Sequence, residues 1–326
     1  MSKPTKFHLS FLILIGFILV VTNSCTDKSL LPVVETTKLT GVSSTTLTCW
    51  GNVPADAGSA ISARGACWST SPNPTTSNSK QTSAAGTGNF KVAVSGLTMG
   101  TTYYIRCYAT NSTGTSYGGQ LTFTTLLEDV DGNTYHTVMI GKQEWMVENL
   151  KVGRYRDGTL IHKVTDPTVW GSQTKGAYCS YNEDNTDSIT YGHLYNWSAV
   201  TNSKYLAPTG WHIPTQAEWT TLMTYLGGAS VAADKLKATG TTYWTGNYAG
   251  ATNSSGFTAL PGGSISLDNN VYGFYNLGII GQWWSATEVS SGSSNAYSWY
   301  INNTSSEAIN DKSLKQIGLS VRCIKD

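Results

Sequence analysis

The chain has 326 residues and a formal net charge of +1, and only 13% of its residues are charged. Soluble domains typically contain about 25% charged residues, so this surface is neutral and hydrogen-bonding, as is common in exported β-rich proteins. No basic stripe is present in the sequence, which argues against nucleic acid or anionic lipid as a partner. The length that follows a short N-terminal leader is enough for two domains.

The first 24 residues have the order of a secretory signal. Two lysines precede an apolar run over residues 11–21, and the small residue Ser24 precedes Cys25. The run is about half of the roughly 20 residues that a membrane-spanning helix needs, so we expect it to be cleaved. Ser24 and Cys25 resemble a bacterial lipobox, although Thr22 stands where such boxes usually carry an aliphatic residue. We therefore expect acylation of Cys25, with ordinary cleavage nearby and a free Cys25 thiol as the alternative.

An acylated cysteine would hold the protein on a membrane surface without crossing the membrane. Each buried methylene of an acyl chain adds about 0.8 kcal/mol, and two or more chains hold stably. Cleavage removes two lysines and no acids, so the mature chain has 19 basic and 20 acidic residues. We expect residues 1–24 to be a lipoprotein signal peptide and residues 25–35 a lipidated tether. We therefore expect the mature protein to be a cell-envelope lipoprotein of the outer membrane. Whether it is exposed at the cell surface or faces the periplasm is left open by the sequence.

Residues 36–125 contain short predicted strands at regular spacing, separated by turn signals. The clearest strands are residues 47–50, 64–68, 90–94 and 103–109. The turns between them are rich in Gly, Pro, Asn and Ser, at residues 71–74, 86–89 and 111–114. Short strands with such turns are typical of an all-β sandwich.

Residues 97–103, Leu-Thr-Met-Gly-Thr-Thr-Tyr, resemble the corner of fibronectin type III and related immunoglobulin-like domains. In those domains a tyrosine enters the penultimate strand and its hydroxyl bonds back to the preceding loop. The resemblance gives that role to Tyr103. Ile105, Cys107 and Ala109 alternate with it and should face the core. Similar modules in bacterial surface proteins mostly act as spacers, so we expect a spacer over residues 36–125.

Five cysteines remain when Cys25 is set aside. Export permits disulfides, and the lack of a Cys-x-x-Cys pair or a Cys/His cluster argues against zinc. The immunoglobulin-like resemblance places Cys49 and Cys107 on the two strands that such a bridge joins, and leaves Cys67 free.

Residues 128–326 differ in character, because they hold nine of the eleven tryptophans. An Asp-rich turn over 129–133 precedes a predicted hairpin over 137–145. An EF-hand is excluded there, since Gly132 is the fourth residue instead of the sixth and the twelfth residue is Ile140. One acidic loop is a weak candidate for calcium, with Glu183, Asp184 and Asp187 as its ligands. The alternative is that this loop is solvated and binds no metal. No other metal site is expected.

One helix is clearly predicted in this part of the chain. Residues 215–218, Thr-Gln-Ala-Glu, form a capping box, and Gly227 with Gly228 marks the end. Four apolar residues at helical spacing form one buried stripe: Trp219, Leu222, Met223 and Leu226. The other segments are short and strand-like, among them residues 283–287, 298–301 and 319–324. The pattern predicts an α+β, loop-rich domain.

Several strings of this second part occur in the order found in one bacterial family. They are Gly-Asn-Thr-Tyr (132–135), Trp-Met-Val-Glu-Asn-Leu-Lys (145–151), Tyr-Gly-His-Leu-Tyr-Asn-Trp (191–197), Gly-Trp-His-Ile-Pro-Thr (210–215) with Glu-Trp (218–219), Trp-Ser-Ala-Thr (284–287) and Ser-Val-Arg-Cys (320–323). Together they resemble the Fibrobacter succinogenes major paralogous domain over nearly all of 128–326. The resemblance implies an exported or lipid-anchored protein with a C-type-lectin-like fold. In such a fold the two ends of the domain meet in one sheet, which implies a disulfide between Cys179 and Cys323.

No catalytic arrangement is predicted. The calcium-dependent sugar motifs Glu-Pro-Asn and Gln-Pro-Asp are absent from the sequence, and no catalytic motif surrounds a serine. His193 and His212 each stand beside an aromatic residue and are interpreted as packing residues. The family's fold is also similar to that of the formylglycine-generating enzymes that activate sulfatases, but their redox-active cysteine pair has no counterpart here. We therefore expect a non-enzyme without a cofactor.

Aromatic residues in Gly- and Asn-rich segments are the candidate ligand-binding set: Tyr243, Trp244, Tyr248, Tyr272, Tyr275 and Trp283. Flat aromatic side chains among Ser, Gly and Asn make adaptable recognition surfaces, and the alternative is that they fill the core of a loop-rich fold. The leading hypothesis is a head that binds a glycan or an extracellular protein without catalysis. The second is a structural or assembly component with no soluble ligand, and the third is a degenerate enzyme.

Overall fold

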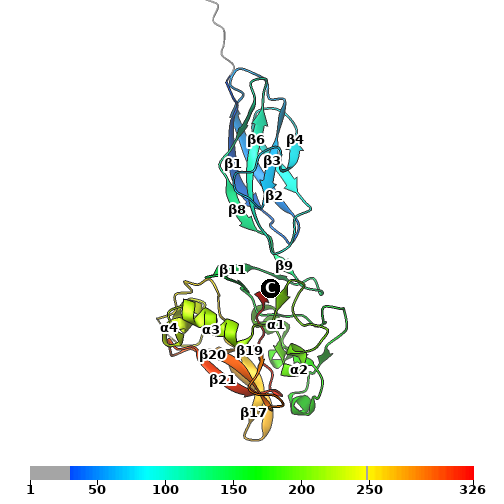
Figure 1. The fold of residues 1–326 in the computed structure, drawn as a ribbon, viewed down its shortest axis with the longest axis vertical. Helices are drawn as coiled ribbons and strands as arrows, with labels where there is room; N and C mark the ends of the chain where they lie inside the picture. Colours follow the sequence, from blue (N-terminus) through cyan, green and yellow to red (C-terminus); the bar gives the residue numbers. More distant parts are fainter. Residues whose placement is uncertain (1–29, 247–248) are drawn as a thin grey trace, which may run out of the picture.

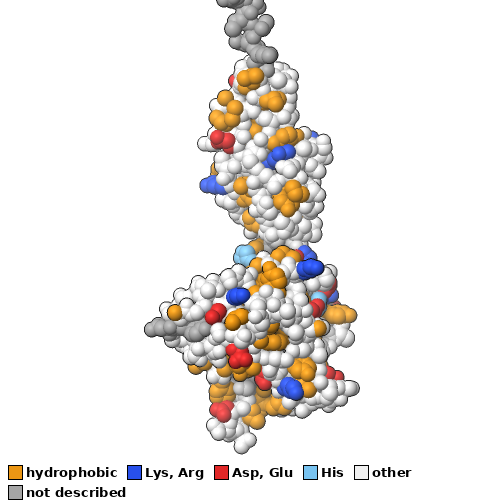
Figure 2. All heavy atoms as spheres, turned by 60° about the vertical axis from the view of Figure 1, so that its left-hand side comes forward, with side chains coloured by type: hydrophobic (Ala, Val, Ile, Leu, Met, Phe, Trp, Pro, Cys, Tyr) orange, Lys and Arg blue, Asp and Glu red, His pale blue; other side chains and the backbone are white. Residues whose placement is uncertain are grey.

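The computed structural model describes residues 30–246 and 249–326, which form a β-sandwich and a larger head arranged in line (Figure 1). The predicted signal peptide, residues 1–24, and the predicted acylation site, Cys25, lie outside the described residues. Within the described ranges no helix is long and apolar enough to cross a membrane. The face shown in Figure 2 is mostly uncharged, with acidic and basic side chains scattered over it.

The sandwich consists of two antiparallel sheets. The first has the order β1 (Val33–Thr40), β2 (Leu47–Ala55) and β5 (Gly88–Val94). The second has the order β4 (Ser79–Ser83), β3 (Ala63–Ser69) and β6 (Thr102–Thr110), and both β7 (Thr115–Tyr117) and β8 (Leu121–Thr124) pair with β6. This is the strand arrangement of a fibronectin type III-like sandwich, with a core of alternating inward-facing residues from both sheets.

The predicted tyrosine corner is confirmed. The Tyr103 hydroxyl accepts a hydrogen bond of 3.1 Å from the backbone N–H of Thr98. Ile105, Cys107 and Ala109 are fully buried between the sheets, as their alternation with Tyr103 predicts.

The five described cysteines are buried free thiols, so neither predicted disulfide is formed in the structure. Cys49 and Cys107 are neighbours, as predicted, with 3.6 Å between their Sγ atoms, compared with about 2.05 Å in a disulfide. The prediction that Cys179 pairs with Cys323 is wrong for this structure. These two side chains belong to separate hydrophobic clusters, because Cys179 packs on the η1–β17 side of the head and Cys323 in its centre.

The head combines short sheets with four helices in its described part. Its sheets are β9 (Leu127–Glu128) with β10 (Thr134–Tyr135); β11 (Thr137–Ile140), β12 (Gln143–Met146), β22 (Ile324–Lys325) and β16 (Trp211–His212); β13 (His162–Lys163), β14 (Ala177–Cys179) and β15 (Leu194–Tyr195); β17 (Gly262–Asp268) and β18 (Val271–Leu277); and β19 (Ile280–Glu288), β20 (Asn295–Asn302) and β21 (Ile309–Leu314). Its helices are α1 (Asn185–Tyr191), α2 (Trp197–Val200), α3 (Gln216–Tyr225) and α4 (Ala229–Leu236), with the 3-10 turns η1 (Pro167–Ser172) and η2 (Tyr181–Glu183). The C-type-lectin-like assignment of this domain stays a prediction.

The predicted helix is α3. Thr215 is its N-cap and forms the predicted capping box with Glu218, whose carboxylate accepts from the Thr215 backbone N–H at 2.7 Å. The predicted apolar stripe is buried, and it packs on the core beneath β19 and β20: Trp219, Leu222, Met223 and Leu226. Gly227 and Gly228 follow with φ of 97° and 104°, a backbone conformation that glycine adopts readily and that ends the helix.

The C-terminal segment passes through the centre of the head. Residues 319–324 are predicted as one strand, but only Ile324 is in one, and the preceding residues bond in turn to several segments. The Val321 carbonyl accepts from Leu150 N–H at 2.8 Å, and the Ser320 carbonyl from Trp284 N–H at 3.1 Å. Ile324 then pairs with Trp145 of β12, so the two ends of the domain do meet in one sheet, as the family resemblance implies.

Asn149 and Arg322 form a polar hub inside this core. Arg322 is fully buried, and its Nη2 and Nε donate to Asn149 Oδ1 at 2.8 and 3.2 Å. The same oxygen accepts from Trp283 Nε1 at 2.8 Å, and Asn149 Nδ2 donates to the Tyr191 carbonyl at 2.8 Å. Arg322 Nη1 also donates to the Phe257 carbonyl, and the guanidinium lies 4.1 Å from the centre of the Phe257 ring. The hub therefore joins five segments that are far apart in sequence.

Direct contacts connect the sandwich to the head. Ser44 Oγ donates to Glu128 Oε2 at 2.6 Å, and the Leu126 N–H donates to the Ser43 carbonyl at 3.0 Å. From the C-terminus, Lys325 Nζ donates to the Gly100 carbonyl at 3.1 Å, which places the end of the chain at the junction (Figure 1).

Candidate functional site

The predicted aromatic set does not form one surface. Trp244 and Trp283 are only 4% and 2% exposed, so their assignment to ligand-binding loops is wrong. Each fills the core with its indole N–H satisfied, Trp244 by the Ala259 carbonyl at 3.1 Å and Trp283 by Asn149. Tyr248 lies outside the described residues.

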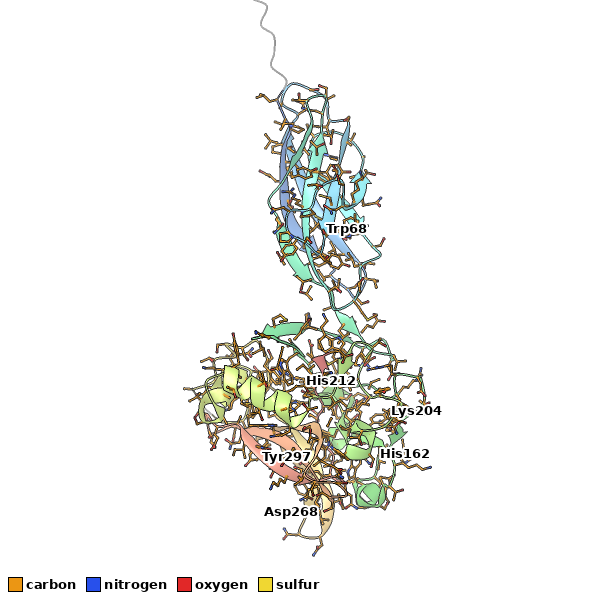
Figure 3. The ribbon with its side chains drawn as sticks, viewed as in Figure 1. Trp68, His162, Lys204, His212, Asp268 and Tyr297 are labelled. Atoms are coloured by element: carbon orange, nitrogen blue, oxygen red, sulfur yellow. The ribbon has the colours of Figure 1, made fainter. Side chains whose placement is uncertain are left out.

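The other three tyrosines of the set are partly accessible but separate. Tyr243 packs edge-on against Tyr191 with 6.3 Å between ring centres. Tyr272 and Tyr275 lie on β18, in the hairpin that points away from the sandwich and ends beside Asp268 (Figure 3). Tyr275 bonds within its own strand, since its hydroxyl donates to the Val271 carbonyl at 3.2 Å. No aromatic platform for a ligand results from these residues.

The acidic loop uses its carboxylates internally. Glu183 forms an ion pair with Lys163 at 2.8 Å, and Asp184 caps helix α1 by accepting from Thr186 N–H at 2.6 Å. Burial and the neighbouring Asp184 raise the pKa of Asp187. No group of three metal-ligating side chains occurs among the described residues. The loop is therefore a helix start instead of a calcium loop.

His193 is a packing residue, as interpreted from the sequence. Its ring lies between Tyr178 and Tyr195, at 4.8 and 6.2 Å between ring centres, and its Nδ1 is 3.5 Å from Ser180 Oγ. Burial, together with the positive charge of Lys163, lowers the pKa of His193 from 6.5 to about 4. The ring is neutral at pH 7 and is half-buried among these side chains.

This lowered pKa makes the head sensitive to acid. Between about pH 6.5 and pH 4 the unfolded chain binds a proton at His193 that the folded chain does not bind. The free energy of unfolding should therefore fall as the pH falls, by about 1.4 kcal/mol per pH unit from this residue in that window. Urea unfolding at several pH values should show a shallower pH dependence in His193→Phe. An equal slope in the two proteins would show that His193 does not cause the effect.

His212 serves to join the chain end to helix α3. Its Nδ1 lies 2.7 Å from Asp326 Oδ1 and its Nε2 lies 2.9 Å from Glu218 Oε1. Burial opposes the charged form, but these two hydrogen bonds prevail and raise the pKa of His212. Both ring nitrogens are engaged by carboxylates, so no hydroxyl or thiol in the described part of the chain is activated by this histidine.

A cavity of about 620 Å³ opens on one flank of the head, where Figure 3 shows Lys204 and His162 on the same side. We call it the basic pocket, and its lining is Tyr155, Thr159, Leu160, His162, Thr174, Lys175, Gly176, Ser198, Asn202 and Lys204. The lining contains two lysines, a histidine, hydroxyl groups and an amide, and it contains no carboxylate. Its volume is in the range of about 300–1,000 Å³ that is usual for small-molecule sites.

A tight turn forms one wall of the basic pocket. The Asp157 carboxylate accepts from Thr159 N–H at 2.8 Å, and Gly158 has a φ of 85°, which the turn requires. The Tyr155 N–H donates to the Thr159 carbonyl at 2.8 Å and closes the turn. Lys204 Nζ reaches across to Thr159 Oγ1 at 2.7 Å, so the turn and the segment after α2 are joined at the rim.

Asn196 holds the opposite wall. Its Oδ1 accepts from Ala177 N–H and Ala199 N–H, each at 3.0 Å, and its Nδ2 donates to the Lys175 carbonyl at 2.8 Å. These bonds fix the start of β14 against helix α2, with Gly176 at the closest approach. A Cβ atom at Gly176 would overlap the Tyr155 hydroxyl, so glycine is required there.

The basic pocket carries positive charge that the protein neutralises only in part. Lys204 is paired with Asp157 at 3.3 Å, and both side chains are 46% exposed. Across residues 30–246 and 249–326, neither the Lys175 ammonium nor the His162 ring has a hydrogen bond or ion pair. Such a site can bind anionic and hydroxylated groups.

A second cavity of about 610 Å³ lies between helix α3 and the turn joining β11 to β12. Its polar groups are mostly engaged, because the hydroxyls of Thr220, Thr221 and Thr224 donate to α3 carbonyls at 2.8 to 2.9 Å. Tyr225 lies against Gly141 at its edge. The basic pocket offers more unpaired polar groups and is therefore the better candidate.

Comparison with known families assigns the head. The model of the Fibrobacter succinogenes major domain family matches residues 138–325, more than half of the chain. The chain belongs to this family. The whole basic pocket lies within the matched Fibrobacter succinogenes major domain, and Asn196, which builds its wall, is in the family string 191–197. No curated protein matches the sequence.

Two solved structures illustrate the similarity of part of the chain to small β-domains. One is the sensor domain of the anti-sigma factor RsgI4 from Pseudobacteroides cellulosolvens, with 15% identity over 29% of this chain and 93% of that one, and a TM-score of 0.23. The other is the fibronectin type III domain of human fibronectin type III domain containing protein 3, with 22% identity over 29% of this chain and 84% of that one, and a TM-score of 0.22.

The sequence does not predict the basic pocket. Its two lysines and its histidine come from three separate segments, and none belongs to the family strings. The one local signal is the Tyr-Asn-Trp end of the string 191–197. Its Asn196 is of a residue type that often caps the start of a helix, and here it fixes the pocket wall.

Proposed function

We propose that the protein is a non-catalytic recognition protein of the cell envelope, in which the Fibrobacter succinogenes major domain binds a glycan or another polar ligand in the basic pocket. The observation that supports this most is the set of unpaired polar groups around a cavity of suitable size. Hydroxyl, amide and ammonium groups are the donors that recognise oxygen-rich ligands.

The sandwich is proposed as the spacer that holds the head away from the membrane. The described chain begins with Leu30 at the end of the sandwich that faces away from the head (Figure 1). An acyl chain on Cys25 would therefore anchor the distal end of the sandwich, and the head would lie farthest from the membrane. Intact mass of the protein purified from membranes tests this anchor, since acylation adds mass and an unmodified Cys25 would refute it.

Blocking the pocket should abolish binding. Ser198 lies on α2 at the pocket wall, and its hydroxyl makes no hydrogen bond within residues 30–246 and 249–326, so Ser198→Trp should fill the cavity without breaking a contact. On an array of glycans and extracellular proteins, the soluble chain from residue 26 should bind a ligand that Ser198→Trp loses. Ser290→Trp, on an exposed turn after β19, is the matched control and should bind normally.

Two results would contradict the proposal. Equal binding by Ser198→Trp, with its circular dichroism and melting temperature unchanged, would place recognition elsewhere on the chain. Absence of binding on a broad array by folded wild-type protein would favour the structural role, in which the head packs against neighbouring molecules.

A further inference from the structure

We infer that the ligand of the basic pocket is an acidic saccharide, whose carboxylate or sulfate oxygens are bound by Lys175 and Lys204. The inference rests on the proposed function, because it names the ligand class for the same pocket. It starts from the charge of the lining, which has two lysines and no Asp or Glu.

Lys175 is the main anion-binding group. Its ammonium has no ion pair or hydrogen bond within the described part of the chain, while its backbone carbonyl is fixed by Asn196 Nδ2 at 2.8 Å. The backbone of Lys175 is therefore fixed, while its ammonium group has no partner among the described residues. An ammonium in this state binds a carboxylate or sulfate oxygen without first losing a protein contact.

Lys204 can exchange its present partner for a ligand. Its ion pair with Asp157 is 3.3 Å long and exposed, and such surface pairs contribute little. Its shorter bond is to Thr159 Oγ1, at 2.7 Å, and this bond directs the ammonium over the pocket rim. A ligand anion at the rim could therefore gain a charged hydrogen bond from Lys204 at small cost.

The rest of the lining favours a sugar over a simple ion. A single carboxylate or sulfate occupies a small part of a cavity of about 620 Å³. The hydroxyls of Thr174 and Ser198 can both donate to and accept from sugar hydroxyls. The Asn202 oxygen is already used, because it accepts from the Lys204 N–H at 3.0 Å. Leu160 is 73% exposed at the edge and offers an apolar contact for the C–H face of a sugar ring.

The test uses pairs of polymers with the same sugar backbone, one acidic and one neutral. The chain from residue 26 to 326 would be titrated with polygalacturonate and its full methyl ester, and with dextran sulfate and neutral dextran. We expect binding to at least one acidic polymer, at least about tenfold weaker binding to its neutral partner, and a marked loss of affinity as salt is raised. The acidic polymer that binds better identifies the anion as carboxylate or sulfate.

Variants place the binding in the pocket. Lys175→Met with Lys204→Met should lower affinity for the acidic polymer about tenfold or more. Lys312→Met is the control. It removes one exposed positive charge on β21, outside the pocket, and should have little effect on affinity. Both lysines are exposed, so melting temperatures should not change. Ser198→Trp should abolish binding to the same polymer.

The outcomes separate the two proposals. Binding of neutral and acidic partners to the same extent, lost in Ser198→Trp, would overturn the acidic ligand and uphold recognition in the pocket. Acidic binding that survives both the lysine substitutions and Ser198→Trp would overturn both, since it would lie elsewhere. No binding to any polymer overturns the acidic saccharide, and the array then decides the proposed function separately.

Discussion

Asn149→Ala is expected to lower the free energy of unfolding of the head by about 3–5 kcal/mol, because it leaves a buried charge without its main acceptor. Arg322 is fully buried, and two of its N–H groups donate to Asn149 Oδ1. Alanine also leaves the Trp283 indole N–H and the Tyr191 carbonyl without the partners that Asn149 supplies. The remaining contacts of the guanidinium, with Phe257, cannot replace these bonds.

Chemical denaturation followed by tryptophan fluorescence measures this effect, because nine of the eleven tryptophans are in residues 128–326. Asn185→Ala is the matched control, since Asn185 is exposed at the start of α1. The control should change stability by less than about 0.5 kcal/mol. A loss below about 1 kcal/mol in Asn149→Ala would mean that water or the remaining contacts satisfy Arg322, and the hub would not be essential.

Refolding in a glutathione redox buffer is expected to join Cys49 to Cys107 and to raise the free energy of unfolding of the sandwich by about 4 kcal/mol. Their sulfur atoms are already 3.6 Å apart, and the loop that the bridge closes spans 58 residues. The hydrogen bond with Cys107 and burial raise the pKa of Cys49, so at equilibrium in the folded state this thiol stays protonated. Refolding is needed because both side chains are buried and closed to an oxidant.

Intact mass and peptide mapping report the bridge, and denaturation with and without a reductant reports the gain in stability. Cys67 should stay a thiol, because its Sγ bonds to the Pro74 carbonyl at 3.5 Å, whereas the sulfur atoms of Cys49 and Cys107 contact each other. Cys49→Ser should lose the reductant-sensitive part of the stability. A bridge that includes Cys67, or five free thiols after refolding, would contradict this pairing.

Local sequence signals predict the elements that depend on neighbours in the chain. The capping box at 215–218 determines the start of α3, and the alternation after Tyr103 determines which side of β6 is buried. Both follow from short-range hydrogen bonding and from the periodicity of helices and strands. Asp184 shows the limit of such signals, since an acidic cluster that suggests calcium is in fact a helix cap.

Features that depend on distant segments could not be predicted. Trp244 and Trp283 lie in Gly- and Asn-rich sequence, but the segment around Asn149 and the Ala259 carbonyl bury them and satisfy their N–H groups. Residues 319–324 have a strand pattern, yet they bond to several segments in turn instead of one partner strand. The basic pocket is the clearest case, because Lys175 and Lys204 are brought together only by the tertiary fold.

The most direct test of the account is a map of backbone amide chemical shifts in the chain from residue 26, recorded as an oligogalacturonate is added. The account predicts that the shifted amides belong to residues 157–162, 174–177 and 198–204, which form the walls of the basic pocket. Shifts confined to the β17–β18 hairpin, to helix α3 or to the sandwich would contradict it, because they would place recognition on a surface other than this pocket.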